Sequence, residues 1–363
     1  MRDPKSTNDG ARADGDEAAG RVVPFPSDAP RASEEPLSPA DELGEDSDLT
    51  QLREALDELR NEIRSRFPGP SRQTGSPPLA VEWMPLVEEL RRRLGTLGMR
   101  ERSGHVDEFG MDDVVMQRAA RLFDFLQDRY WRIDVLGLDR VPSGRPVLYV
   151  ANRSGLLPYD GIMLSHLVER ARPEEPRPRF LVADWLVTLP FVQPQLARIG
   201  GVRACRENAD RLLRSGRSVV AFPEGVQGAA KVFRERYRLK RFGRGGVIRT
   251  ALENGVPLVP VGIVGAEEAH PILFKWHLPA RALGLPFLPV TPTFPWMGPA
   301  GALPLPTKWV VSFGEPLDLR GPGAPDASTS GDPLALSRLT QQLRTTIDGL
   351  VHQGLEHRPS VWG

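Results

Sequence analysis

SVVAFPEG at residues 218–225 and PLVPVGIV at residues 257–264 contain two apolar runs, and each run predicts a buried β-strand. The first strand stops at Pro223-Glu224-Gly225, because proline lacks the N–H that a sheet requires and glycine permits a tight turn. Residues 245–253 predict a helix between the strands, and it ends at the common C-terminal signal Asn254-Gly255. A strand, a long crossover and a second strand indicate a parallel β/α unit.

The segment between these two strands is strongly basic. Eight cationic side chains and a single anionic one, Glu235, lie between residues 231 and 249. The cations are Lys231, Arg234, Arg236, Arg238, Lys240, Arg241, Arg244 and Arg249. An anion-binding loop is one interpretation, because α/β sheets bind anionic ligands at the carboxyl ends of their parallel strands. An ordinary solvated loop is the other.

The rest of the chain continues the alternation of strands and helices. Short apolar runs predict further strands at 131–136, 146–150, 180–183, 202–205 and 309–313. Helices are predicted at 112–129, 160–169, 193–199, 208–215 and 334–353. An apolar, proline-rich stretch without a period predicts a loop at 283–306. We therefore expect an α/β fold with a largely parallel central sheet flanked by helices.

The composition divides the chain into segments. We predict a disordered acidic tail at 1–46, an amphipathic helix at 47–67, a Pro/Gly/Ser linker at 68–78, a helix and connector at 79–110, the main domain at 111–318, and a linker with a C-terminal helix at 319–363. The helix at 47–67 carries leucines at alternating spacings of three and four. Such a stripe suits either self-association or packing on the chain's own domain.

Charge, cysteine content and hydropathy indicate the cellular setting. Residues 1–48 hold 13 of the 47 acidic and 5 of the 47 basic side chains, so the remaining 42 basic and 34 acidic ones give the body a net charge of +8. A mildly basic body suits an anionic ligand or membrane surface. One cysteine excludes an internal disulfide and favours a reducing compartment. Without a signal peptide or a run of about 18 apolar residues, we expect a cytoplasmic protein with peripheral membrane contact.

The motifs also resemble a known family. FPEG at 222–225 followed by GVPLVPV at 255–261 resembles the third and fourth sequence blocks of the glycerolipid acyltransferases, which include the lysophosphatidate and glycerol-phosphate acyltransferases. KVFRERY at 231–237, RFG at 241–243 and GAEE at 265–268 are similar to a bacterial branch grouped with monoacylglycerol acyltransferases. The resemblance covers about half of the chain and implies the glycerol-phosphate acyltransferase-like fold.

NRSGLLPYD at residues 152–160 stands where the family has its catalytic block. There a histidine deprotonates the acceptor hydroxyl, which attacks the acyl thioester, and a downstream aspartate orients the imidazole. Arg153 occupies the histidine's position and Asp160 the aspartate's. Because arginine stays protonated and cannot act as the base, we expect an ion pair between Arg153 and Asp160. His166 and His270 are the alternative bases that we consider.

The resemblance implies ligand-binding residues in the second and third blocks. Arg206 matches an acceptor-phosphate ligand, and a surface salt bridge with Glu207 or Asp210 is the alternative. Glu224 matches the acceptor-binding glutamate, and Gly225 would let the backbone approach a ligand.

The chain departs from the family pattern at one position that concerns the acceptor, and it matches the pattern at two prolines that concern the acyl chain. Val226-Gln227 stands where a common family form has Thr-Arg, whose arginine grips phosphate. A neutral mono- or diacylglycerol-like acceptor therefore becomes plausible, although Lys231 or Arg206 could compensate for the missing cation. Pro257 and Pro260 match positions that shape the acyl tunnel, and the end of a core strand is the other interpretation.

The resemblance implies an O-acyltransferase that moves a fatty acyl group from acyl-CoA or acyl-carrier protein to a glycerolipid hydroxyl, at the inner face of the membrane. Catalysis would use another base or positioning alone, or this branch would take a different acceptor. The alternative, which Arg153 favours, is a catalytically inactive lipid-binding or scaffold protein that keeps the fold. We expect no cofactor, metal site or nucleic-acid partner, because the corresponding motifs are missing from the sequence.

Overall fold

The computed structural model describes residues 84–95, 106–155, 157–187, 192–282, 287–298, 301, 303–317, 319 and 332–362. The expected acidic tail, the helix at 47–67 with its self-association, and the linker at 68–78 lie outside these ranges. The helix expected after that linker is present as α2 (Met84–Gly95), which contacts α3 (Asp113–Phe125).

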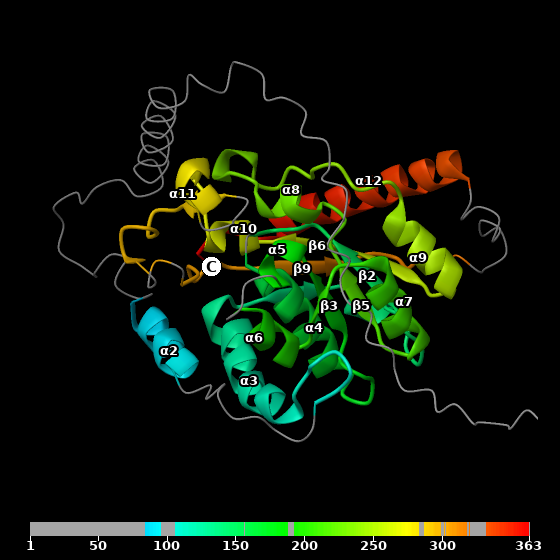
Figure 1. Cartoon of the computed structure of the whole chain (residues 1–363), viewed down its shortest axis with the longest axis horizontal. Coiled ribbons are helices and arrows are strands. Elements are labelled where there is room, and N and C mark those ends of the chain that lie inside the picture. The colour runs from blue at the N-terminus through cyan, green and yellow to red at the C-terminus, as the bar shows by residue number, and fades with distance from the viewer. Residues whose placement is uncertain are drawn as a thin grey trace, which may run out of the picture. The chain divides into compact units, whose positions relative to one another are not determined.

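A seven-stranded sheet forms the centre of the described chain (Figure 1). Its spatial order is β1-β9-β6-β2-β5-β3-β4. The strands are β1 (Asp134–Leu136), β2 (Leu148–Ala151), β3 (Arg179–Val182), β4 (Gly201–Arg203), β5 (Val219–Ala221), β6 (Leu258–Val264) and β9 (Val310–Phe313). Every neighbouring pair is parallel except β6 and β9. The prediction of a largely parallel α/β sheet is therefore confirmed.

Helices cover both faces of this sheet (Figure 1). Besides α2 and α3, the helices of the described ranges are α4 (Tyr159–Ala171), α5 (Asp184–Val187), α6 (Gln193–Arg198), α7 (Arg206–Arg214), α8 (Gly225–Ala229), α9 (Gly246–Asn254), α10 (Ala266–Ala269), α11 (His277–Ala282) and α12 (Pro333–His357). Successive strand residues point to opposite sides. In β2, Tyr149 and Ala151 belong to the core shared with α3 and α4, whereas Leu148 and Val150 belong to the core shared with α7, α9 and α12.

Two parts of the chain differ from the sequence prediction. β7 (Phe274–Trp276) and β8 (Leu288–Val290) form an antiparallel hairpin, with α11 between the two strands. Of these, β8 lies within the stretch at 283–306 that was predicted as an apolar loop. Its prolines concealed the pattern: Pro289 lies within β8, which pairs on one side only, as proline requires. The turn predicted after Pro223 also continues into a helix, α8.

Candidate active site

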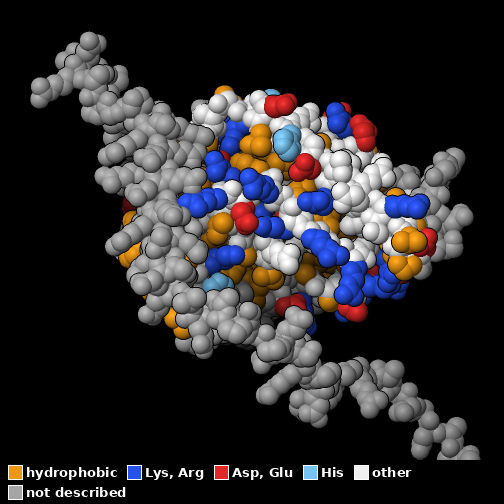
Figure 2. Space-filling model, turned by 90° about the horizontal axis from the view of Figure 1, so that it is seen from above, with side chains coloured by type: hydrophobic (Ala, Val, Ile, Leu, Met, Phe, Trp, Pro, Cys, Tyr) orange, Lys and Arg blue, Asp and Glu red, His pale blue; other side chains and the backbone are white. Residues whose placement is uncertain are grey.

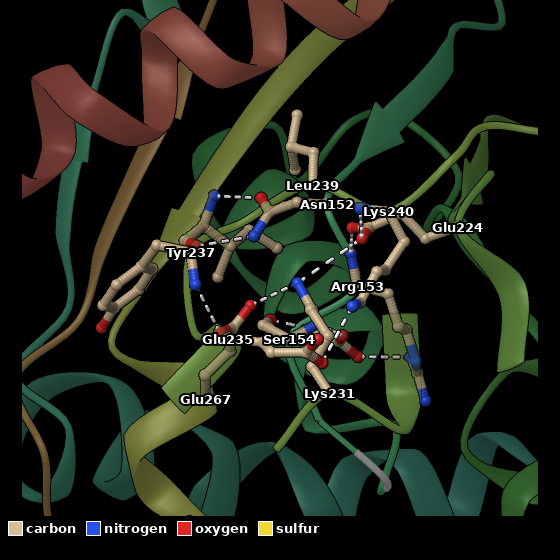
Figure 3. A network of polar contacts seen from close by, with 12 residues as sticks. Asn152, Arg153, Ser154, Glu224, Lys231, Glu235, Tyr237, Leu239, Lys240 and Glu267 are labelled. Carbon is tan, nitrogen blue, oxygen red and sulfur yellow. Dashed lines mark hydrogen bonds and ion pairs between the residues drawn. The ribbon is translucent and has the colours of Figure 1, made fainter. Parts of the chain in front are cut away.

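Three polar segments meet where the neighbouring strands β2, β5 and β6 end. These strands are parallel to one another through β2, so their carboxyl ends lie at the same edge of the sheet. Residues 152–154 follow β2, residues 222–224 follow β5, and residues 265–268 follow β6. Figure 3 shows their side chains in one network of polar contacts.

The expected ion pair between Arg153 and Asp160 is present. The Arg153 Nη1 atom lies 2.6 Å from Asp160 Oδ1, and the two side chains are 6% and 1% exposed. Asp160 is in the first turn of α4, where its carboxylate also accepts hydrogen bonds from the N–H groups of Ser154 and Gly161. Burial raises the pKa of the Asp160 carboxyl, against the opposing effect of the Arg153 guanidinium.

Asn152 fixes the backbone immediately before this pair. Its side-chain amide donates to the Ile263 carbonyl at 2.9 Å and accepts from the Ile263 N–H at 2.7 Å. The side chain thus bonds to β6 as a strand residue would, just beyond the end of β2. Arg153 is thereby held at the edge of the sheet, with its guanidinium 5.0 Å from the centre of the Phe222 ring.

Glu224 connects the Arg153 segment to the basic loop. Its Oε1 atom accepts from the Arg153 N–H at 2.8 Å, and its Oε2 atom accepts from the Lys240 N–H at 2.7 Å. The Lys231 ammonium lies 3.5 Å from Glu224 and 2.5 Å from Glu267. Glu267 in turn accepts from the Tyr237 N–H at 2.6 Å. The buried Lys231 ammonium thus connects the carboxylates of Glu224 and Glu267 in one network (Figure 3).

The buried cluster has one more acid than it has cations. Asp160, Glu224 and Glu267 face Arg153 and Lys231, and all five residues are at least nine-tenths buried. Burial raises the pKa of Glu267, although the nearby Lys231 ammonium opposes the shift. Burial thus shifts the pKa of two of these carboxyl groups, Asp160 and Glu267, in the same upward direction, and perturbed carboxyl groups are common at acid–base sites.

Helix α8 closes this cluster from one side. A Cβ atom on Gly228 would lie 2.6 Å from the Glu224 Cβ and 2.7 Å from the Arg153 Cβ, so only glycine allows the helix to lie so close. Gly225 begins α8 with a φ of +57°, and a Cβ there would meet nothing within 4 Å. The positive φ, rather than crowding, accounts for glycine at this position. Ligand contact by Gly225 stays a prediction.

Arg206 lies apart from the cluster. It begins α7, after the edge strand β4, and its half-exposed side chain pairs with Glu253 and, at 3.5 Å, with Asp210. These contacts match the alternative interpretation of Arg206, a surface salt bridge with Asp210, while phosphate binding by Arg206 stays a prediction.

The two prolines lie in and beside the central strand. Pro260 lies within β6, opposite Val150, and Pro257 immediately precedes that strand, where its carbonyl accepts from the Leu148 N–H at 3.0 Å. These contacts fit the interpretation as core-strand residues, and a role in an acyl tunnel stays a prediction.

The two histidines considered as alternative bases have different surroundings. His166 is buried against α3, with its Nε2 atom 3.1 Å from Asp124 and its ring against Phe123. His270 follows α10 and stacks on Tyr159, with ring centres 5.6 Å apart. His270 therefore contacts the residue that precedes Asp160 in the chain.

Several contributors were not assigned from sequence. Glu267, Tyr237 and Lys240 complete the network, and Arg358 from the end of α12 binds Glu268 and donates to the Tyr237 hydroxyl at 3.2 Å. Two consecutive acids directly after the buried strand β6 were the available signal, because a carboxylate at a sheet edge needs a partner.

The described ranges contain no cluster of three or more His, Cys, Asp or Glu side chains arranged to hold a metal ion. Within those same ranges, every helix is too short or too polar to cross a lipid bilayer.

Comparison with known proteins identifies similar sequences. Residues 132–264 match the family model described as acyltransferase. An uncharacterized protein of Mycobacterium leprae is 42% identical over 258 residues, which make up 71% of this chain and 70% of that protein. Uncharacterized proteins of Mycobacterium bovis and Mycobacterium tuberculosis are each 41% identical over 258 residues, 71% of either chain.

One solved structure is also similar. The crystal structure of the 1-acyl-sn-glycerophosphate acyltransferase PlsC from Thermotoga maritima aligns with a TM-score of 0.44 and 18% identity. The alignment covers 77% of this chain and 90% of that one.

Proposed function

The chain belongs to the acyltransferase family, and we propose that it transfers a fatty acyl group from acyl-CoA or acyl-carrier protein to a glycerolipid hydroxyl. The observation that carries the proposal is the buried pair of Arg153 and Asp160. The pair lies within the residues that match the family model, at the carboxyl ends of parallel strands, where α/β enzymes place their sites.

In the proposed reaction the acceptor hydroxyl oxygen attacks the carbonyl carbon of the acyl thioester. The new O–C bond forms as the C–S bond breaks, Asp160 takes the hydroxyl proton, and the departing thiolate receives that proton. A carboxylate whose pKa is raised by burial suits this role. The Arg153 guanidinium, which stays protonated, stabilises the negative charge on the carbonyl oxygen.

We propose that α8 moves when the substrates reach this pair. Arg153 and Asp160 are 5% and 2% exposed, and Gly228 of α8 packs directly on Arg153. The helix has five residues and begins at a glycine with positive φ. A short element of this kind is suited to act as a lid.

A neutral acceptor, such as a mono- or diacylglycerol, agrees best with the cations near the pair. Lys231 already contacts Glu224 and Glu267, and Arg206 already contacts Asp210 and Glu253. Both cations that could replace the missing phosphate-binding arginine are therefore already paired with carboxylates.

Peripheral contact with the cytoplasmic face of a membrane belongs to the same proposal. Four large apolar side chains in the segment 274–298 are 45% to 71% exposed: Trp276, Leu278, Trp296 and Met297. Tryptophan favours the level of the lipid headgroups. Replacing Trp296 and Met297 with serine should reduce co-sedimentation with phosphatidylcholine vesicles, whereas unchanged co-sedimentation would remove this surface from the proposal.

The test is acyl transfer by the purified chain from labelled acyl-CoA to lysophospholipid, monoacylglycerol and diacylglycerol acceptors. We expect turnover by the parent chain, and loss of about 100-fold or more in Asp160→Asn. Arg211→Ala, which removes a surface ion pair with Glu108, is the control and should keep full activity. Circular dichroism of each variant checks that the fold is intact.

A second candidate function is lipid binding without catalysis. Two observations favour it. Arg153 stands where the family has its basic histidine, and the Asp160 carboxylate already accepts hydrogen bonds from Arg153, Ser154 and Gly161. No turnover by the parent chain, together with activity in Arg153→His, would support this function over the first.

A further inference from the structure

A groove of about 640 Å³ lies outside the buried cluster, between the basic loop and α12. Loop residues 234–239 form one wall, and the C-terminal half of α12 with the residues after it forms the other. Figure 2 shows Lys and Arg side chains gathered across the face that carries α12. We refer to this feature as the cationic groove.

The helical wall is a stripe of residues on one face of α12. Arg344, Asp348, His352 and Leu355 follow one another at spacings of four, four and three, so their side chains project on the same side. The opposite face of α12 is buried against the sheet, where it contacts β6 and β9. Of the groove stripe, Leu355 also packs against the core beside the sheet, whereas Arg344, Asp348 and His352 are the polar members of the stripe.

Positive charge exceeds negative charge in the cationic groove. Five arginines and two carboxylates line it, a formal excess of three positive charges. The five arginines are Arg234, Arg236, Arg238, Arg344 and Arg358. Both carboxylates have partners within the groove, since Glu268 accepts from Arg358 at 3.1 Å and Asp348 lies 3.8 Å from His352.

Arg344 joins the two walls of the groove. Its Nη2 atom donates to the Leu239 carbonyl at 2.9 Å, so a residue of α12 is held against the basic loop. This contact places a guanidinium group from the helix beside the arginines of the loop.

The shape and lining indicate the class of anion. Guanidinium groups bind phosphate oxygens through two parallel hydrogen bonds, and several together suit a ligand with more than one phosphate charge. Apolar surface from Tyr237, Leu239, Leu355 and Val361 also lines the groove. A volume of this size accommodates a molecule with an organic body as well as the phosphate.

We propose that the cationic groove binds a phosphate ester, with its phosphate groups against Arg238 and Arg344 and its organic part against Leu355 and Val361. A soluble phosphorylated cofactor of the donor type and the phosphate of an anionic lipid share this chemistry. The inference does not depend on acyl transfer, because binding can be measured without turnover.

The groove adjoins the buried cluster through Tyr237. Its N–H donates to Glu267, its hydroxyl accepts from Arg358 and from the Gly265 N–H, and its φ is +65°. A non-glycine residue in this left-handed region is strained and persists only when its neighbours fix it. A ligand in the groove therefore contacts the same residue that orients Glu267.

The experiment is isothermal titration of the full chain with pyrophosphate and coenzyme A, and co-sedimentation with phosphatidylcholine vesicles with and without phosphatidic acid. The test variant is Arg238→Gln/Arg344→Gln. The matched control is Arg241→Gln/Arg244→Gln, which removes the same charge from exposed residues of the same loop that do not line the groove. Arg238→Glu alone, at an exposed position, provides a second variant that leaves the helix packing intact.

We expect the groove variants to weaken binding about tenfold or more, and the control to stay within about twofold of the parent chain. Groove-dependent binding of coenzyme A or pyrophosphate assigns a soluble ligand, and groove-dependent binding of phosphatidic acid vesicles alone assigns a lipid phosphate. Equal loss in the groove and control variants, or no binding of any probe, overturns the proposal.

Discussion

Two charged regions of this molecule meet at Tyr237 and use arginine in opposite ways. In the buried cluster, Arg153 has a carboxylate partner at 2.6 Å and is 5% exposed. In the cationic groove, Arg238 is exposed, and the arginines outnumber the carboxylates. Charges that are buried must be paired to be tolerated, whereas charges at an open surface can be in excess and attract an anion. The comparison separates residues that hold the site together from residues that are available to a ligand.

The largest effect should come from breaking the buried pair. Asp160→Ala removes the carboxylate that faces the buried Arg153 guanidinium, and we expect the free energy of unfolding in urea to fall by about 3–5 kcal/mol. Asp184→Ala is the control, because Asp184 pairs with Arg203 where both side chains are at least half exposed. That control should lose about 1 kcal/mol at most. Similar losses in the two variants would contradict the distinction between buried and exposed charges.

A smaller effect should follow from crowding the buried pair without removing a charge. Gly228→Ala puts a methyl group against the Cβ atoms of Arg153 and Glu224, so we expect a loss of about 1–3 kcal/mol in the same measurement. Gly349→Ala, on the exposed side of α12 with nothing within 4 Å, should instead gain up to about 1 kcal/mol. A neutral Gly228→Ala would show that α8 does not rest on the pair.

Arg206→Ala tests a residue that sequence resemblance assigned to ligand binding and the structure places in a surface ion pair. We expect no measurable change in the free energy of unfolding, because the Arg206 side chain is solvated and an exposed ion pair contributes little. In the acyl-transfer assay the KM for the acceptor should stay within about twofold, as expected when no phosphate is bound there. A large rise in KM for phosphorylated acceptors alone would restore the ligand role.

The smallest effect on stability should come from the cationic groove. Arg238→Gln removes a charge from an exposed side chain among like charges, so we expect the free energy of unfolding to change by no more than about 0.5 kcal/mol. A loss comparable to that of Asp160→Ala would erase the contrast between the two regions. Chemical unfolding of this variant alongside Asp160→Ala supplies the measurement.

Most strands could be predicted because each is a local apolar run. The run predicted at 257–264 forms β6 at 258–264, and the one predicted at 219–222 forms β5 at 219–221. The antiparallel pairing of β9 on β6 could not be predicted, because strand direction depends on how the intervening chain travels. The hairpin of β7 and β8 was missed for a local reason, since its strands are three residues each and β8 contains a proline.

In the candidate site, too, contacts between residues close in the sequence could be predicted, and contacts between distant residues could not. Arg153 and Asp160 are seven residues apart, so a single motif could indicate their ion pair. Lys231 and Glu267 are 36 residues apart, and Arg358 and Glu268 are 90 apart. Contacts at such separations depend on the path of the basic loop and the docking of α12, which no local pattern encodes. The cationic groove became visible only when these elements were placed together.

The edge strand β1 has a consequence for how the protein is made. Its neighbour in the sheet is β9, and the surrounding contacts, such as the hydrogen bond from the Tyr130 hydroxyl to the Pro304 carbonyl, join residues 174 apart. On the ribosome, β1 therefore leaves the exit tunnel long before its partner exists. At about 5–20 residues per second, the interval is on the order of ten to thirty seconds. During that time the nascent chain exposes an unpaired strand and an uncovered Trp131, a natural substrate for chaperones.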